Sequence, residues 1–310
     1  MPSFDTHYAF GIDSLKRLPN GYIKNCCRKH PSAYALGNQG PDSCFFFTQA
    51  IFHKKMLGRQ MHTTHTGLFL QNMFHFAKHH KKEKERSIMV AYLAGFLGHY
   101  ALDTMTHPFI YARTDFDKED PSYSVRHATL ETDLDFLVVR NVLGILPSAL
   151  PRHKLHWLSG KEVSAVRKLF IQAAEKTYPE ETAFTKTKKL DFHIMPLTWA
   201  PFHNKSGRQK KLFQAVEKMF HLKGTLSSQI PEDHRPVNKD PLNKNHDVWV
   251  NPWDETLCST ESFTDLYKKA RKNYLKFLYM LEKALASASD AFRIEPSLSY
   301  LSGLDCTIPY

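Results

Sequence analysis

The most apolar segment of the chain is interrupted by side chains that can bind metals. This segment runs from Ile88 to Leu102 and contains His99, and the same step of four residues leads on to Asp103 and His107. Because residues four apart lie on one face of an α-helix, these three side chains share a face. Imidazole and carboxylate groups are costly to bury unless they bind a partner. We therefore expect a buried helix whose polar face holds a ligand.

A second pair of residues with the same spacing follows in the chain. His127 and Glu131 are four residues apart in a segment that also has helical periodicity. Imidazoles and carboxylates on two helices form a ligand set that suits zinc and related divalent metals. The ordinary alternative is a set of polar contacts along two solvated helix faces. For His107, the alternative is a cation at the end of a helix that stops near Pro108.

Three further candidate ligands lie upstream of this helix, namely His7, Asp42 and His62. Asp42 ends a glycine-rich turn, and it could either bind a metal or cap the helix that we predict after it. His62 has apolar neighbours at helical spacing, which favours a buried position. Asp135 lies one turn beyond Glu131, and we interpret it as a partner of the ligands or a salt-bridge residue.

Helical periodicity dominates the sequence, and no alternating runs of β-branched residues stand out. The expected fold is an all-α multi-helix bundle with long loops, in a single domain over residues 1–310. Its core is expected over about 1–180, with residues from about 185 to 310 as a flank of helices and loops. Helices are predicted over about 43–57, 60–79, 85–107, 124–145, 161–177, 207–222 and 262–288.

The longest predicted loop runs from Ile230 to Glu255 and contains four prolines. A loop of this length inside a compact domain is often functional. Trp249 and Trp253 lie in this loop. Either tryptophan could line the mouth of a substrate site or anchor the loop on the core.

Composition limits the class of protein and of partner. A hydrophobic content of 42% with a mean hydropathy of −0.44 fits a globular protein with a substantial core. The net charge of +11 favours phosphate esters, nucleic acid or an anionic membrane surface, without choosing among them. The five cysteines form no CxxC pair, the N-terminus shows no secretory signal, and the apolar segment is too short to span a membrane. We therefore expect reduced thiols and a cytoplasmic location.

Several segments together resemble the zinc-dependent phospholipase C family, which is related to the S1/P1 nucleases. The centre of the resemblance is the pattern HxxxDxxxH in Gly98–Pro108, followed by HxxxE in His127–Asp135. The likeness is closest to the bacterial branch of the family without a secretion signal. Weaker segments extend it over most of the chain: Met1–Pro2 with Thr6–His7, Gly37–Phe46, Met61–His62, Asp240–Asn243, Trp249, Asn251–Pro252 and Glu261–Phe263.

This resemblance implies an all-helical, P1 nuclease-like fold that binds two or three zinc ions. One ion would be held by four side chains, those of Asp42, His62, His99 and Asp103. Asp103 would bridge to a second ion, which His7 and, after loss of Met1, the amine of Pro2 would also hold. A third ion would be held by His107, His127 and Glu131, although His107 follows Asp103 more closely than in the secreted members.

The resemblance also implies an activity, which is hydrolysis of a phospholipid-type phosphodiester by a zinc-activated water. Asp42 is the candidate general base. The expected partners are a phospholipid or another phosphodiester substrate and a peripheral membrane contact, with no specific nucleic acid and no protein partner. The alternatives are an S1/P1-like nuclease, a small-molecule phosphodiesterase, and a non-catalytic binding protein stabilised by metal.

Overall fold

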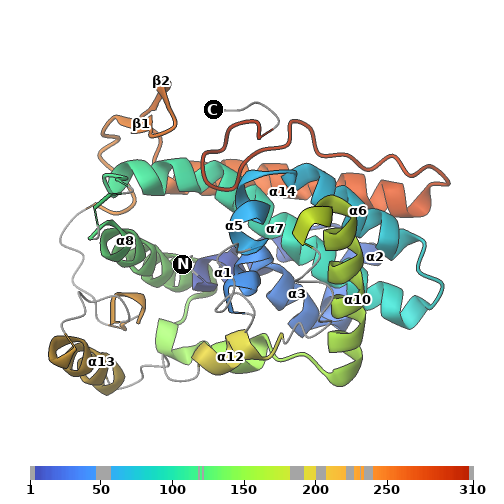
Figure 1. The fold of residues 1–310 in the computed structure, drawn as a ribbon, viewed down its shortest axis with the longest axis horizontal. Helices are drawn as coiled ribbons and strands as arrows, with labels where there is room; N and C mark the ends of the chain where they lie inside the picture. Colours follow the sequence, from blue (N-terminus) through green and yellow to red (C-terminus); the bar gives the residue numbers. More distant parts are fainter. Residues whose placement is uncertain are drawn as a thin grey trace.

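A long buried helix forms the axis of the molecule. In the computed structural model, helices from several parts of the chain pack around this helix, α7 (Glu83–Arg113) (Figure 1). Every residue from Ser87 to Thr104 is buried, which is the pattern of a helix enclosed on all sides. The structure describes residues 4–46, 57–117, 119–120, 122–181, 192–199, 207–220, 227–230, 232–233 and 240–306.

Helices from both ends of the chain pack against α7. They are α1 (Phe4–Arg17), α2 (Tyr22–Lys29), α3 (Pro31–Gly37), α6 (Thr66–Lys78), α10 (Gly160–Thr177) and α14 (Phe263–Ala286). The backbones of α3 and α7 touch, because a Cβ on Gly37 would lie only 2.2 Å from the carbonyl oxygen of Tyr92. This close crossing brings the turn after α3 to the side of His99, whose Nδ1 lies 3.1 Å from the carbonyl oxygen of Asn38.

Shorter elements complete the described fold. The helical ones are η1 (Gly40–Phe46), α5 (Leu57–Thr63), α8 (Tyr123–Val138), η2 (Val139–Leu143), η3 (Pro147–Ala149), α9 (Arg152–Leu155), η4 (Pro179–Glu181), α12 (Ile194–Trp199), α13 (Arg208–Met219) and η6 (Ser227–Gln229). Strands β1 (Trp249–Asn251) and β2 (Asp254–Ser259) form an antiparallel hairpin with Trp249 opposite Ser259. The predicted all-α class is confirmed. The hairpin begins in the predicted long loop and ends at Ser259, beyond the predicted end of that loop at Glu255.

The prediction that the central helix stops near Pro108 is wrong. Helix α7 continues through this proline to Arg113. A proline inside a helix removes one backbone hydrogen bond and costs about 3 kcal/mol. Here the neighbouring Phe109 and Ile110 are buried, and the Trp249 ring packs edge-on against Phe109 at 5.7 Å. Burial of this last turn offsets the cost that the sequence pattern alone suggests.

The predictions for residues 43–79 are also partly wrong. The expected helix over about 43–57 is a 3₁₀ segment, η1, and residues 47–56 lie outside the described part of the chain. The expected helix over about 60–79 is divided into α5 and α6, because His65 adopts a left-handed conformation with φ of 53°. The helical propensity of this segment is overridden here by the packing of α5 and α6 around the centre of the molecule.

The remaining helix predictions agree with the structure within a few residues. Helix α10 begins at a capping box in which Ser159 accepts from the backbone of Glu162, and α14 begins at a similar box formed by Ser262 and Asp265. The expected helix over about 124–145 is α8 followed by the π-turn η2. In the described part of the chain, no helix is long and apolar enough to cross a membrane.

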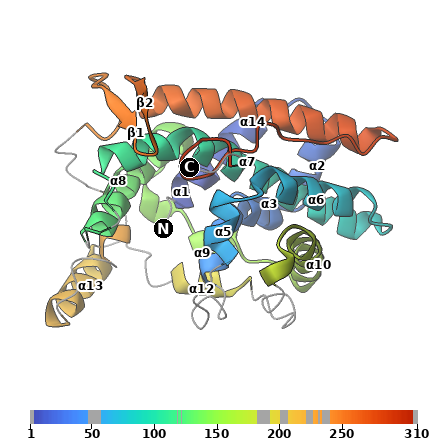
Figure 2. The same cartoon turned by 45° about the horizontal axis from the view of Figure 1, so that its top comes forward.

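The chain after α14 returns as an extended segment, residues 287–306, which we call the C-terminal strap. It runs along α6 toward the centre of the molecule (Figure 2). Phe292 packs on Phe74 at 5.0 Å, and the backbone N–H of Gly67 donates to Ser297 Oγ over 2.8 Å. Further on, the backbone N–H of Tyr300 donates to the carbonyl oxygen of His62 over 2.9 Å. The strap therefore ends beside a histidine that the sequence marks as a ligand.

Candidate metal centre

The structure brings all eight predicted ligands together in the interior, at the meeting point of α1, η1, α5, α7 and α8. Each of them is buried, with at most 8% of its surface exposed. They are His7, Asp42, His62, His99, Asp103, His107, His127 and Glu131. The ordinary alternative of solvated helix faces is therefore wrong. The amine of Pro2 lies outside the described residues.

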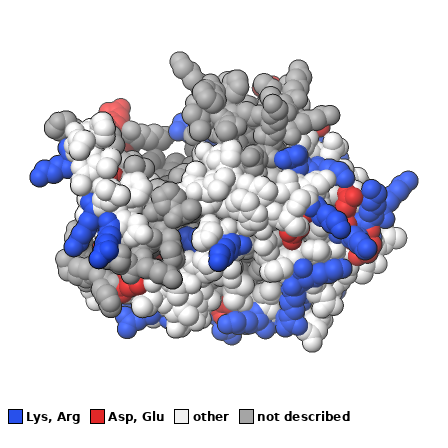
Figure 3. All heavy atoms as spheres, turned by 90° about the horizontal axis from the view of Figure 1, so that it is seen from below, with Lys and Arg blue, Asp and Glu red and all other residues white. Residues whose placement is uncertain are grey.

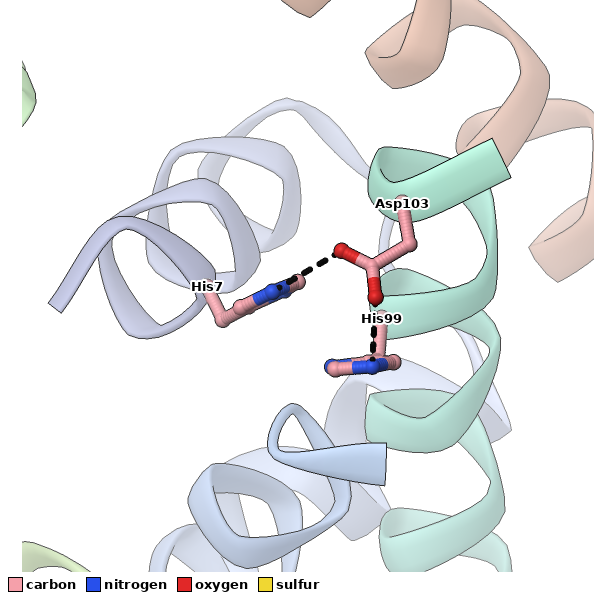
Figure 4. A group of neighbouring side chains, drawn as sticks. All are labelled: His7, His99 and Asp103. Atoms are coloured by element: carbon pink, nitrogen blue, oxygen red, sulfur yellow. Dashed lines mark ion pairs between the residues drawn. The ribbon is translucent and has the colours of Figure 1, made fainter. Parts of the chain in front are cut away.

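The first group of ligand atoms joins α1 to the central helix. His7 Nε2 lies 3.0 Å from Asp103 Oδ1, and His99 Nε2 lies 2.9 Å from Asp103 Oδ2 (Figure 4). The rings of His7 and His99 stack with their centroids 4.1 Å apart. Each oxygen of the Asp103 carboxylate therefore faces a different imidazole.

The second group shares His99 with the first. His62 Nε2 lies 3.0 Å from Asp42 Oδ1, and His99 Nε2 lies 3.7 Å from Asp42 Oδ2. The 3₁₀ segment η1 starts at Gly40, whose φ is 50° and whose missing side chain leaves room for the His99 ring, 2.4 Å from an ideal Cβ. Asp42 is therefore held against two imidazoles, and within the described ranges its side chain caps no helix.

The third group lies between α7 and α8. His127 Nε2 is 3.0 Å and His107 Nε2 is 3.7 Å from Glu131 Oε1. His107 also lies close to Asp103, with Nδ1 3.5 Å from Oδ2, so it connects this group to the first. The three groups satisfy the geometry of a metal site, since their ligand atoms all lie within 4.8 Å of one another in each group.

The outer nitrogens of four of the five imidazoles face fixed partners. The Nδ1 atoms of His99 and His107 donate to the carbonyl oxygens of Asn38 and Tyr300 over 3.1 and 2.8 Å. His62 Nδ1 donates to the carbonyl oxygen of Gly58 in the same way. Because a carbonyl only accepts, the hydrogen of each neutral ring is on Nδ1 and the lone pair of Nε2 points inward. Such outer contacts fix the orientation of metal-binding histidines.

These outer partners are not among the residues that the sequence pattern predicts. Tyr123 Oη lies 2.8 Å from His127 Nδ1, and its position one helical turn before His127 was a usable signal. Gly58 has the same four-residue relation to His62. Tyr300 gave no such signal, because it is far from every ligand in the sequence. Asp135 accepts from the backbone N–H of Thr6 over 2.6 Å, so it holds α1 beside the ligands.

Several buried atoms of the eight residues have no hydrogen-bond partner in the described part of the chain. They are His7 Nδ1, Asp42 Oδ2, His99 Nε2, Asp103 Oδ2 and Glu131 Oε2. An unpaired buried polar atom costs about 1–3 kcal/mol. The bare Nε2 of His99 faces Asp103 Oδ2 across 2.9 Å, where two lone pairs oppose each other. A divalent cation would satisfy such atoms together, so this donor set fits zinc.

The electrostatics of the groups also favour positive charge. Burial opposes ionisation of Asp103, but His107, His99 and His7 hold the pKa of this carboxyl well below its usual range. Burial lowers the pKa of His107, but Asp103 and Glu131 outweigh burial and raise this pKa to about 9. Without a metal, the carboxylates are therefore compensated by protonated imidazole, the role that a cation would take over.

A fourth group of similar composition lies on the surface. His75 on α6 and His79, which directly follows this helix, are four residues apart, and both lie close to Asp290 in the strap. All three residues are exposed, and Lys78 Nζ lies 3.3 Å from Asp290 Oδ1. The Lys78 ammonium already compensates the charge of the Asp290 carboxylate. In this respect the surface group differs from the three buried groups.

Comparison with known proteins identifies the family. A model of the zinc-dependent phospholipase C family matches residues 6–186, which is more than half of the chain and includes all eight candidate ligands. Neither a curated protein nor a solved structure matches the chain. The strap and Tyr300 lie outside the matched residues. The chain belongs to the zinc-dependent phospholipase C family.

Proposed function

We propose that this protein hydrolyses phospholipid-type phosphodiesters with two or three zinc ions held by the buried groups. The observation that carries the proposal is that five atoms of the predicted ligands are buried without a hydrogen-bond partner among the described residues. Buried polar side chains that serve only stability are rarely left unpaired, and here five unpaired atoms gather in one place. The family match supports the same class of metal and substrate.

The ligands divide among the ions by proximity. In this proposal Asp103 would help to hold two ions, because its two oxygens face His7 and His99 separately. Asp42 and His62 would hold the ion beside His99. His107, His127 and Glu131 would hold a last ion. When bound, such ions lower the pKa of a coordinated water toward about 7 and neutralise phosphate oxygens.

Asp42 is the proposed general base. Its Oδ1 faces His62 over 3.0 Å, while its Oδ2 has no hydrogen-bond partner in the described part of the chain. The free oxygen can accept the proton of the attacking water, and Gly40 keeps the turn close to His99. The same water would then form a bond to phosphorus as the bond from phosphorus to the glycerol oxygen breaks, and the glycerol oxygen would take up a proton from solvent.

The substrate is proposed to approach from the side of His127. This histidine is the most exposed of the eight ligands, at 8%. Partly exposed aromatic rings adjoin it: the Tyr111 ring lies 4.8 Å from both His127 and Trp253. Trp253 therefore fits the role of lining a substrate mouth. Trp249 anchors the loop instead, since its Nε1–H donates to the carbonyl oxygen of Glu261 over 3.0 Å.

Metal analysis and a substrate panel test the proposal. We expect purified protein to contain zinc and to release diacylglycerol from phosphatidylcholine, with weaker activity on single-stranded nucleic acid and nitrophenyl phosphodiesters. Asp42→Asn should reduce turnover by about 10²–10⁴-fold, the usual contribution of a general base. Asp290→Asn serves as the matched control and should keep full activity. Protein without divalent metal, or metal-loaded protein inactive on the whole panel, would contradict the proposal.

A further inference from the structure

Helix α13 (Arg208–Met219) presents its apolar residues to solvent. Leu212 is 64% exposed, Met219 is 72% exposed, and Phe220, which follows the helix, is 66% exposed. With Val216, which is 37% exposed, they lie at helical spacing and form one stripe. Globular proteins usually turn such a stripe toward their core. We call these four residues the α13 stripe.

The opposite face of α13 is held to the protein by polar contacts. Glu217 is buried, and its carboxylate accepts from the backbone N–H of Ser227 over 3.0 Å. Lys210 Nζ lies 2.7 Å from Glu232 Oε2. These contacts fix the rotation of the helix about its axis. The fold therefore fixes the outward orientation of the α13 stripe. Charged side chains occupy the face of α13 that contacts the protein, where apolar side chains are usual.

Basic side chains flank the α13 stripe. Arg208, Lys211 and Lys218 are all exposed on this helix. Figure 3 shows the molecule from below, the side on which α12 and α13 lie in Figure 1, and Lys and Arg predominate there over Asp and Glu. Leu197 of α12, 57% exposed, adds an apolar side chain on this side.

We propose that α13 docks the protein on the headgroup region of an anionic phospholipid bilayer, with the α13 stripe inserted among the lipids. An amphipathic helix with exposed apolar residues and flanking lysines lies in the plane of such an interface. Long basic side chains can reach anionic headgroups while their stems follow the apolar surface. The inference rests on the proposed function, since a lipid substrate lies in a bilayer that the enzyme has to reach.

Vesicle sedimentation of the full chain tests the apolar contribution. Wild-type protein should bind vesicles of phosphatidylcholine with phosphatidylglycerol. The double variant Met219→Ser with Phe220→Ser should lose about a hundredfold in partition coefficient, because two large side chains no longer insert. The matched control is Leu257→Ser with Tyr279→Ser, which removes two exposed apolar side chains of β2 and α14 and should bind like wild type.

Charge reversal tests the electrostatic contribution. Lys211→Glu with Lys218→Glu should abolish the preference for vesicles that contain phosphatidylglycerol over phosphatidylcholine alone. The control Lys272→Glu with Lys276→Glu changes the net charge equally on the exposed face of α14 and should retain that preference. Loss of the preference in both variants would show a non-specific effect of net charge and would overturn the assignment to α13.

A soluble phosphodiester separates this proposal from the catalytic one. All four variants should hydrolyse a nitrophenyl phosphodiester at the wild-type rate. If the wild type binds vesicles through α13 but hydrolyses no phosphodiester, the proposed function fails and the docking surface stands. If wild type and the Met219→Ser, Phe220→Ser variant sediment equally with vesicles, the docking proposal fails. A wild-type dimer that this variant converts to a monomer would also overturn it, in favour of a contact between copies.

Discussion

The buried candidate metal centre and the surface group of His75, His79 and Asp290 are built from the same residue types. Both place polar residues four apart along a helix or at its end, and both add a carboxylate or imidazole from another element. The surface residues are about half exposed, so water can reach their polar atoms. Spacing alone therefore does not distinguish the two regions.

The difference between the two regions lies in what compensates each carboxylate. At the surface, Lys78 and solvent satisfy Asp290. In the interior, Asp42, Asp103 and Glu131 each keep an oxygen without a hydrogen-bond partner among the described residues. Burial removes water as an alternative hydrogen-bond partner. An unpaired carboxylate oxygen in the interior therefore costs free energy, which a bound cation would remove. A metal-binding pattern in a sequence gains meaning when the fold buries it.

The largest expected effect in this comparison follows from Asp103→Asn. This change keeps the shape of the side chain but removes the charge that faces His7, His99 and His107. Loss of one partner from a buried charged cluster costs about 3–5 kcal/mol, so metal binding should weaken about a thousandfold. Elemental analysis and metal titration measure the loss. An Asp103→Asn variant with full metal content and activity would refute the bridging role.

His156 tests whether burial of a histidine is enough to recruit a metal. It is buried, its Nδ1 donates to the carbonyl oxygen of Arg152, and its Nε2 accepts from Gln39 Nε2. Burial lowers its pKa to about 4, so the unfolded chain binds the proton first as the pH falls. The stability from neutral His156 is complete above pH 6.5, and about 3 kcal/mol is lost as the pH falls toward about 4.

Urea unfolding of metal-free protein across this pH range measures the effect. The variant His156→Gln should lack this part of the pH dependence, so that wild type and variant converge in acid. Parallel curves for the two proteins would contradict the pKa shift. Equal zinc content of the two proteins would show that a buried and satisfied histidine takes no part in metal binding.

The next expected effect concerns the outer contacts of the metal centre. Tyr300→Pro removes the backbone N–H that donates to the carbonyl oxygen of His62 and should loosen the strap over His62 and His107. Loss of such an outer contact weakens metal binding about 10–100-fold. Tyr300→Phe is the control, because it keeps the backbone contacts. Equal zinc dissociation constants for both variants would show that the strap does not position the ligands.

The smallest expected effect is at the surface group. Asp290→Asn should leave zinc stoichiometry unchanged and should alter activity by less than about twofold, since exposed ion pairs contribute little. Isothermal titration with zinc after saturation of the buried centre checks this expectation. A tight additional zinc equivalent that this variant loses would place the surface group alongside the interior ones.

Much of the fold could be predicted from periodicity. The all-α class, the buried central helix and the helices α10 and α14 follow from the spacing of apolar residues and from Ser-led caps. Two features could not be predicted in this way: the continuation of α7 through Pro108 and the break between α5 and α6 at His65. Each depends on packing against residues far away in the sequence. The single domain over residues 1–310 stays a prediction.

The chemistry of the candidate site was determined mainly by sequence. Four-residue steps on two helices identify five of the eight candidate ligands, since helical geometry is local. Only the tertiary structure decided that His7, Asp42 and His62 meet them and that His107 lies with His127 and Glu131. It also decided that the strap orients two imidazoles and that the α13 stripe faces outward. These relations depend on burial and on contacts between distant segments, which spacing along one helix does not contain.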